Sequence, residues 1–322
     1  MIRLFSYRPG VLALASVFFC APLSAANPEP GGQIQSSDAK EWIRSMREAG
    51  LHLHYQGIGA SWQNDQLRIL RIRHEVLNGQ EREQVEALDN TNGDDAAPLG
   101  DTSAEPRSPG NNPSRMGNWP LNLTLAGRYY RFALGREGRI SGRNVQEIVI
   151  TPLDEARYGR RVWIDKESRL PLKHELISPD GRILEQFVFA ELTVLDAPLS
   201  ADQAAANDSP PLMGHVPVQQ AIDTLTWRLE NVPKGYRIVA YARHNAPNNS
   251  VIEHLLLSDG FSPISVYIEE ALRAFPNDGR LRHFGAMHVF SRQAGEYRIT
   301  VMAEAPAATV TQIAQGVRRG EP

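Results

Sequence analysis

Cysteine is nearly absent from the sequence. The 322 residues include one cysteine, Cys20, in an N-terminal segment that we expect to be removed. A protein without cysteine can form no disulfides and has no thiol chemistry, which excludes small disulfide-stabilised secreted folds. Neither sign of charge dominates, because 34 basic residues are balanced by 37 acidic ones, a formal net charge of −3. This balance offers nucleic acid no overall attraction, and we expect no nucleic-acid partner.

The sequence also lacks an apolar run long enough to span a bilayer, which needs about 20 residues. Its most apolar stretch, residues 11–21, follows Arg3 and Arg8 and precedes the small residues of segment 23–26. This order of features is typical of a secretory signal peptide. We predict that residues 1–26 are removed, leaving an exported, soluble protein with 32 basic and 37 acidic residues.

Two breaks in composition divide the exported chain. Residues 89–118 contain no aromatic residue, valine or isoleucine, so we expect a disordered insertion that either stays mobile or partly docks as a lid. Residues 196–217 are rich in alanine and proline and are predicted to be a linker. The predicted domains are therefore residues 27–195 and 218–322, a number of domains that fits the length of the chain.

The N-terminal domain is predicted to be a helix packed on a curved antiparallel sheet. Ser36 or Ser37 can cap a helix over residues 36–50, whose apolar residues recur at helical spacing. Turn residues separate the strand-like segments that follow, which favours an antiparallel meander, and Gly57 with Gly59 indicates a bend within a strand. The predicted strands are residues 51–55, 67–76, 129–134, 147–150, 161–164, 172–177 and 185–195.

The C-terminal domain is predicted to be a small α+β unit, which makes the whole chain an α+β protein of two domains. Its last segment, residues 307–319, places apolar residues at the i, i+3, i+4 and i+7 positions of a helix that packs on a sheet. The strands expected before it are residues 237–243, 251–258, 264–268, 283–291 and 297–303.

No group of residues indicates catalysis or metal binding. His52 and His54 would share one face of a strand, but no third ligand follows, so we interpret them as surface residues. His283 and His288 would point to opposite faces of one strand. We therefore expect a protein that is not an enzyme and has neither a metal nor a cofactor.

Several segments, spread over nearly the whole exported chain, point to one family: residues 42–46, 70–74, 162–171, 180–187, 232–236, 257–261 and 305–310. Together they resemble the MucB/RseB family, whose members are periplasmic regulators of the envelope-stress sigma factor (sigma-E or AlgU). The resemblance implies an N-terminal domain like the lipoprotein carriers LolA and LolB, an unclosed β-barrel with helical cover. It also implies binding of the periplasmic part of an RseA or MucA type anti-sigma factor, protection of that part from site-1 proteolysis, and release when lipid or lipopolysaccharide is sensed.

The resemblance supplies no list of binding residues, so we predict them from chemistry. An open, curved sheet can enclose an apolar concavity that holds an acyl chain, although ordinary core packing explains the same side chains. Arginine binds phosphate bidentately, although a GC-rich genome also explains 30 arginines against 4 lysines. The predicted lipid-binding residues are Tyr55, Trp62, Tyr130, Phe132, Trp163 and Phe187 for the acyl chain and Arg71, Arg73 and His74 for the anionic headgroup.

The C-terminal domain and its junction are predicted to bind the anti-sigma factor, because an edge strand or an interdomain cleft can capture an extended segment. The residues chosen are Phe261, Tyr267, Arg280 and Arg282. We expect lipid to change the relative position of the domains and thereby to weaken partner binding. A periplasmic lipid or lipoprotein carrier is the alternative function, and the sequence leaves open whether the protein forms a homodimer.

Overall fold

The computed structural model describes residues 31–77, 80–88, 121–198, 222, 225–245, 250–271 and 279–320. Three predicted segments lie outside these residues and stay predictions: the signal peptide (1–26), the insertion (89–118) and most of the linker (196–217). Only residues 196–198 of the linker are described. None of the described helices is both long enough and apolar enough to cross a membrane.

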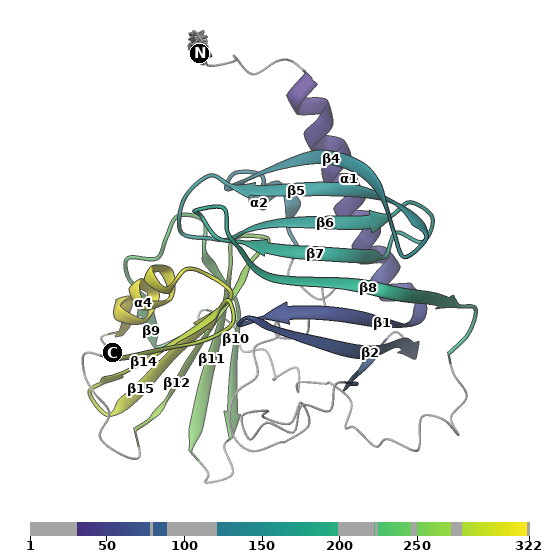
Figure 1. Ribbon diagram of the computed structural model, residues 1–322. Coiled ribbons are helices and arrows are strands. Elements are labelled where there is room, and N and C mark those ends of the chain that lie inside the picture. The colour runs from purple at the N-terminus through teal and green to yellow at the C-terminus, as the bar shows by residue number, and fades with distance from the viewer. Residues whose placement is uncertain are drawn as a thin grey trace, which may run out of the picture.

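An antiparallel sheet of eight strands, with one long helix against it, forms the N-terminal half of the described chain (Figure 1). Its strand order is β3-β2-β1-β8-β7-β6-β5-β4, so β3 and β4 are the two edges and do not pair with each other. The sheet is therefore unclosed, as expected. Its elements are α1 (Gly31–His52), β1 (His54–Gln63), β2 (Gln66–Leu77), β3 (Gln80–Ala87), α2 (Leu123–Ala126), β4 (Tyr130–Ile140), β5 (Arg143–Pro152), β6 (Gly159–Asp165), β7 (Pro171–Ile177) and β8 (Ile183–Leu195).

A separate six-stranded antiparallel sheet, in the order β10-β11-β12-β15-β14-β13, forms the C-terminal half, which confirms the two-part α+β fold. Figure 1 shows it at one end of the strands of the larger sheet. Helix α4 packs on its strands β14 and β15. The elements are β9 (Trp227–Leu229), β10 (Arg237–Asn245), β11 (Val251–Ser258), β12 (Pro263–Glu270), β13 (Arg280–Phe284), β14 (Met287–Ala294), β15 (Tyr297–Ala303), α4 (Ala307–Gly316) and β16 (Val317–Arg319).

Helix α1 covers part of the inner face of the large sheet. Ala39, Ile43 and Met46, spaced to lie on one side of the helix, are buried against β4, β5 and β6. The helix was predicted to end at Gly50 but continues to His52, so the prediction of a strand over residues 51–55 with His52 and His54 on one face is wrong. Hydrogen bonds explain the longer helix: the Leu53 N–H donates to the Ala49 carbonyl, and His74 Nε2 donates to the Gly50 carbonyl.

Three other elements differ from the predictions. Strand β3 was missed because Glu, Gln and Arg dominate its sequence, as suits a solvated edge strand. The predicted strand 283–291 is a hairpin of β13 and β14 that turns at Gly285, so His283 and His288 lie opposite each other rather than on one strand. The last helix ends at Gly316, because Val317–Arg319 pair with β9 as strand β16.

Gly59 leaves room for an aromatic ring of the neighbouring strand β8. Strand β1 pairs regularly with β2, but its register with β8 shifts between Ile58 and Gly59, where β8 contains one extra residue. The bend predicted within β1 stays a prediction. A Cβ atom at Gly59 would lie 2.4 Å from Cζ of the Phe187 ring. The missing side chain therefore makes room for that buried ring on the inner face.

We expect Gly59→Ala to lower the free energy of unfolding by about 1–3 kcal/mol, because the buried Phe187 ring must move out of its packed position. The matched control is Gly138→Ala in β4, where the new Cβ would have only Val145 Cγ2 nearby, at 3.8 Å. That change is expected to stay within about 0.5 kcal/mol. Urea denaturation measures both, and equal losses would contradict the close approach.

Candidate functional site

Four of the aromatic residues predicted to bind lipid lie on the inner face of the large sheet. Tyr55, Tyr130, Phe132 and Phe187 are each at most 5% exposed. Tyr130 and Phe132 pack with α1 in one apolar cluster, whereas Tyr55 and Phe187 pack with Phe189 in a second. Lipid binding by these residues stays a prediction, and in this structure their side chains fill the inner face by packing on one another and on α1.

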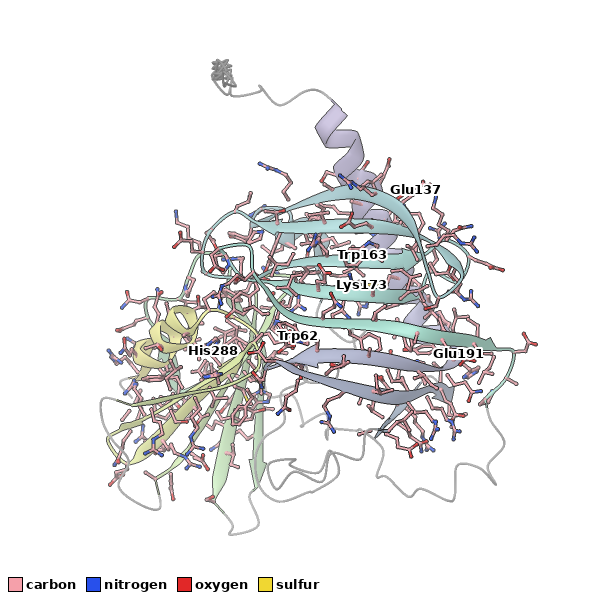
Figure 2. All side chains as sticks on the ribbon, viewed as in Figure 1. Trp62, Glu137, Trp163, Lys173, Glu191 and His288 are labelled. Carbon is pink, nitrogen blue, oxygen red and sulfur yellow. The ribbon has the colours of Figure 1, made fainter. Side chains whose placement is uncertain are left out.

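The assignment of Trp62 to the same apolar face is wrong. Tyr55 and Trp62 are an odd number of residues apart on a regularly paired strand, so their side chains point to opposite faces. Trp163 alternates with the buried residues Val162 and Ile164, and its partly buried indole packs against the second cluster. Figure 2 shows Trp163 beside Lys173 on the neighbouring strand, and the Lys173 ammonium lies 4.4 Å from the centre of the indole.

The three residues predicted to bind an anionic headgroup do not form one site. Arg71 and Arg73 point to the outer face, and Arg71 pairs at 2.6 Å with Glu86 on β3. His74 is buried on the inner face, where its ring stacks on Tyr55 with 4.7 Å between ring centres. Successive side chains of a regular strand point to opposite faces, and His74 directly follows Arg73, so the histidine and the arginines lie on different faces of the sheet.

The residues predicted to bind the anti-sigma factor occupy three different places. Phe261 is 2% exposed and packs between Tyr130 and Phe132 in the N-terminal half, so in this arrangement it is an interdomain contact and not an exposed binding residue. Tyr267 of β12 stacks on the His254 ring of β11, with 4.3 Å between ring centres. Arg280 and Arg282 are exposed on β13. Partner binding by these residues stays a prediction.

A buried arginine joins the two halves. Arg157, in the loop between β5 and β6, has no exposed surface. Its guanidinium donates three hydrogen bonds: to Asp154 Oδ1 at 2.9 Å, to Asp259 Oδ2 at 2.8 Å and to the Lys234 carbonyl at 2.6 Å. Because Asp259 and Lys234 belong to the C-terminal half, one side chain connects two of its loops to the N-terminal domain.

Three tyrosine rings surround this guanidinium. The Arg157 carbon Cζ lies 4.9 Å from the centres of the Tyr129 and Tyr236 rings and 5.6 Å from that of Tyr130. Burial raises the pKa of the Tyr130 and Tyr236 hydroxyls, so both stay protonated. The Tyr130 hydroxyl can therefore donate to Asp259 Oδ2, at 2.9 Å. Cation–π contacts of this kind are strongest where water is excluded.

The loop that carries Asp259 directs Phe261 into the N-terminal half. Asp259 Oδ1 accepts the backbone N–H groups of Phe261 and Ser262 at 2.9 and 2.8 Å. Gly260 has φ +95°, and a Cβ atom there would lie 2.6 Å from the Asn122 carbonyl oxygen. The Asn122 N–H donates to the Gly260 carbonyl at 2.8 Å, so glycine is needed for both the turn and the contact. We call Arg157, Asp259, Phe261 and the three tyrosines the interdomain joint.

Further polar contacts extend the boundary between the halves beyond the joint. Arg160 pairs with Glu304 at 2.8 Å. The Glu185 carboxylate accepts the Ala286 N–H at 2.6 Å, from the turn of the β13–β14 hairpin. Burial, together with the negative charge of Glu304, raises the pKa of the Glu185 carboxyl. Two separate regions of the C-terminal half are thus attached to the large sheet, which opposes free rotation of the domains.

The sequence singled out two segments of the joint but did not predict that they contact Arg157. Two of the segments that carry the family resemblance, 232–236 and 257–261, are the two loops that bind Arg157. Arg157 itself belongs to a group of arginines that codon usage explains equally well. No local pattern pairs it with Asp259, because 102 residues separate the two in sequence.

Inside the large sheet, His174 of β7 points to the inner face. Its ring stacks on Phe187, with 5.7 Å between ring centres. Burial, and to a lesser degree the positive charge of Arg160, lowers the pKa of His174 to about 3. The imidazole is therefore uncharged at neutral pH and adds to the apolar packing of the inner face.

We expect Arg157→Ala to lower the free energy of unfolding by about 3–5 kcal/mol, because it leaves Asp259 charged and buried without its partner. Arg157→Lys keeps the charge but cannot make all three bonds, so its loss is expected to be smaller. The control is Arg71→Ala, which removes the exposed pair with Glu86 and is expected to cost less than about 1 kcal/mol. Chemical denaturation measures all three, and a mild effect of Arg157→Ala would show that the joint does not hold the domains.

The lowered pKa of His174 predicts an acid-dependent loss of stability. Between pH 3 and 6.5 the unfolded chain binds a proton at this residue and the folded chain does not, so stability falls as pH falls through this window. The slope is at most about 1.4 kcal/mol per pH unit. Denaturation at pH 7 and pH 5 is expected to show a smaller difference for His174→Gln than for the unchanged protein. His52→Gln, on the exposed end of α1, should keep the full difference.

Comparisons with known proteins cover both halves of the chain. The sequence profile of the MucB/RseB N-terminal domain matches residues 38–94 and 108–213, and that of the MucB/RseB C-terminal domain matches residues 221–318. The sigma factor AlgU regulatory protein MucB of Pseudomonas aeruginosa is 27% identical over 88% of this chain and 92% of its own. The sigma-E factor regulatory protein RseB of Salmonella typhimurium is 28% identical over 95% of this chain and 96% of its own.

A solved structure agrees with the fold. The crystal structure of MucB in complex with MucA(peri) is 25% identical to this chain, covers 88% of it and 100% of its own length, and superposes with a TM-score of 0.65. The match therefore spans most of this chain. This chain belongs to the MucB/RseB family.

Proposed function

We propose that this protein is a periplasmic regulator that binds the periplasmic segment of an RseA or MucA type anti-sigma factor. By shielding that segment from site-1 proteolysis, it would restrain the envelope-stress sigma factor. Membership of the MucB/RseB family over both domains carries this proposal, and the solved complex of a relative with MucA(peri) supports it. The signal-peptide pattern of residues 1–26 supports export to the periplasm.

The proposal makes the protein a binding protein and not a catalyst. Several buried polar side chains are used within the fold: the joint uses Arg157 and Asp259, and Glu185 accepts hydrogen bonds from Gln63 and from the backbone of Ala286. Regulation through binding needs a stable binding surface and a signal that weakens the binding of the partner.

Release by lipid is the second part of the proposal. The inner face of the large sheet offers the aromatic side chains that an acyl chain prefers, but these side chains are packed against α1. An acyl chain can enter only if α1 or the rings move. Phe261 belongs to the same apolar cluster as Ile43 of α1 and Phe132 of β4, so displacement of α1 would also disturb the joint. This shared cluster is a physical route from lipid to the C-terminal half.

The proposed function is tested with the purified chain from residue 27 onward and the periplasmic segment of the cognate anti-sigma factor. Titration calorimetry is expected to show a complex, and adding purified site-1 protease should cleave the segment more slowly in its presence. Saturating lipopolysaccharide should weaken the complex. By linkage, the segment must weaken lipopolysaccharide binding by the same factor.

Two outcomes would contradict the proposal. Absence of binding to the segment would remove the regulatory function, and if lipopolysaccharide still bound, a lipid carrier would be the better description. Binding that lipopolysaccharide leaves unchanged would remove the sensing part alone. Full-length protein is needed for this test, because cutting off the C-terminal half removes Phe261 from an apolar cluster of the N-terminal domain.

A further inference from the structure

Strand β13 is an open edge of the C-terminal sheet. It is the last strand in the order β10-β11-β12-β15-β14-β13 and pairs with β14 on one side. Among the described residues no strand pairs with its other side. All five of its residues, Arg280–Phe284, are exposed. The outer row of backbone N–H and C=O groups can therefore accept another strand.

The features that usually protect an edge strand are mostly missing here. The pairing of β13 with β14 has no register shift, and the strand contains no proline. Two large apolar side chains are accessible, with Leu281 45% and Phe284 46% exposed. The protection that remains is positive charge: Arg280 and Arg282 point to one face, and neither makes an ion pair in the part of the chain that the structure describes.

The charge and the alternation of β13 define what it can bind. Two unpaired arginines on the same edge disfavour pairing of β13 with a second copy of itself, since like charges would lie opposite each other. An extended segment with acidic residues at alternate positions would place its carboxylates beside Arg280 and Arg282. The residues between them would then face the side of Leu281, where apolar side chains are favoured.

The β13–β14 hairpin is also held in place before any partner arrives. The Ala286 N–H at its turn donates to Glu185 Oε1 at 2.6 Å, and Gln63 Nε2 donates to the other oxygen of the same carboxylate at 2.8 Å. Both partners belong to the large sheet. Figure 2 shows Trp62, which precedes Gln63, at the end of the large sheet that meets the C-terminal half. A fixed edge loses little conformational entropy on binding.

We propose that β13 is where the anti-sigma factor binds, by adding an extended segment of alternating acidic and apolar residues as a seventh strand of the C-terminal sheet. This rests on the proposed function, because it names the surface that the partner uses. The hydrogen bond from Ala286 to Glu185 attaches the turn of the β13–β14 hairpin to the large sheet, where lipid is proposed to act.

The test compares two pairs of exposed arginines on edge strands. The double variant Arg280→Glu, Arg282→Glu reverses the charge of β13. Its control, Arg136→Glu, Arg139→Glu, does the same on β4, an edge of the large sheet that carries a bulge. Affinity for the cognate periplasmic segment is expected to fall at least about tenfold in the β13 variant and to stay within about twofold in the control. Equal thermal melting temperatures verify that both variants fold.

A charge exchange makes the result specific. Segment peptides in which acidic residues are replaced by lysine are expected to bind the β13 variant better than the unchanged protein. If the unchanged protein binds the segment and the β13 variant binds it equally well, the edge is not the site and the proposed function stands. If the unchanged protein does not bind, both proposals fail.

Two further measurements address misfolding of the double variant and binding of β13 to an anionic membrane. Should the double variant be poorly folded, Leu281→Ser alone tests the same edge without changing its charge, and undiminished affinity there would overturn the proposal. Vesicles of phosphatidylglycerol provide the comparison with an anionic membrane. If charge reversal on β13 abolishes vesicle binding but leaves the peptide affinity unchanged, β13 is a membrane contact and the proposal is wrong.

Discussion

The ion pair between Arg157 and Asp259 is the constraint around which the two halves of the protein are arranged. Removing both charges from water costs several kcal/mol for each ion, so the pair persists only if hydrogen bonds and close packing compensate. Here the Asp259 carboxylate accepts four hydrogen bonds and the Arg157 guanidinium donates three. These hydrogen bonds fix the loops of both halves of the protein. The same loop places Phe261 in the N-terminal core.

Such a pair contributes more to geometry than to net stability, because an apolar replacement of the same shape is often equally stable. The guanidinium contacts three tyrosine rings and a carbonyl, and it can do so in only one orientation. These contacts therefore fix the position of one domain relative to the other. A signal that altered the joint would therefore change a defined arrangement. Free hinge motion between the domains does not fit a joint of this kind.

Much of the architecture could be predicted from the sequence, because it depends on local patterns. The face of α1 with Ile43 and Met46 and the buried stripe of α4 follow from helical spacing. It was harder to predict on which face of the sheet a side chain lies. Trp62 and Tyr55 are both aromatic residues of β1, and only the register of β1 with β2 shows that they lie on opposite faces. The joint could not be predicted, since it forms between segments far apart in sequence whose role appears only on contact.

The arrangement links the proposed ligand to the proposed partner through one continuous set of contacts. Ile43 of α1, Phe132 of β4 and Phe261 share an apolar cluster, and Phe261 follows Asp259 in the joint. At the other contact, Glu185 of β8 binds the turn that leads from β13. A change on the inner face can thus reach the C-terminal sheet at two points. Because packed interiors shift between discrete arrangements rather than deforming gradually, we expect a small displacement of α1 to move the joint out of its fitted geometry.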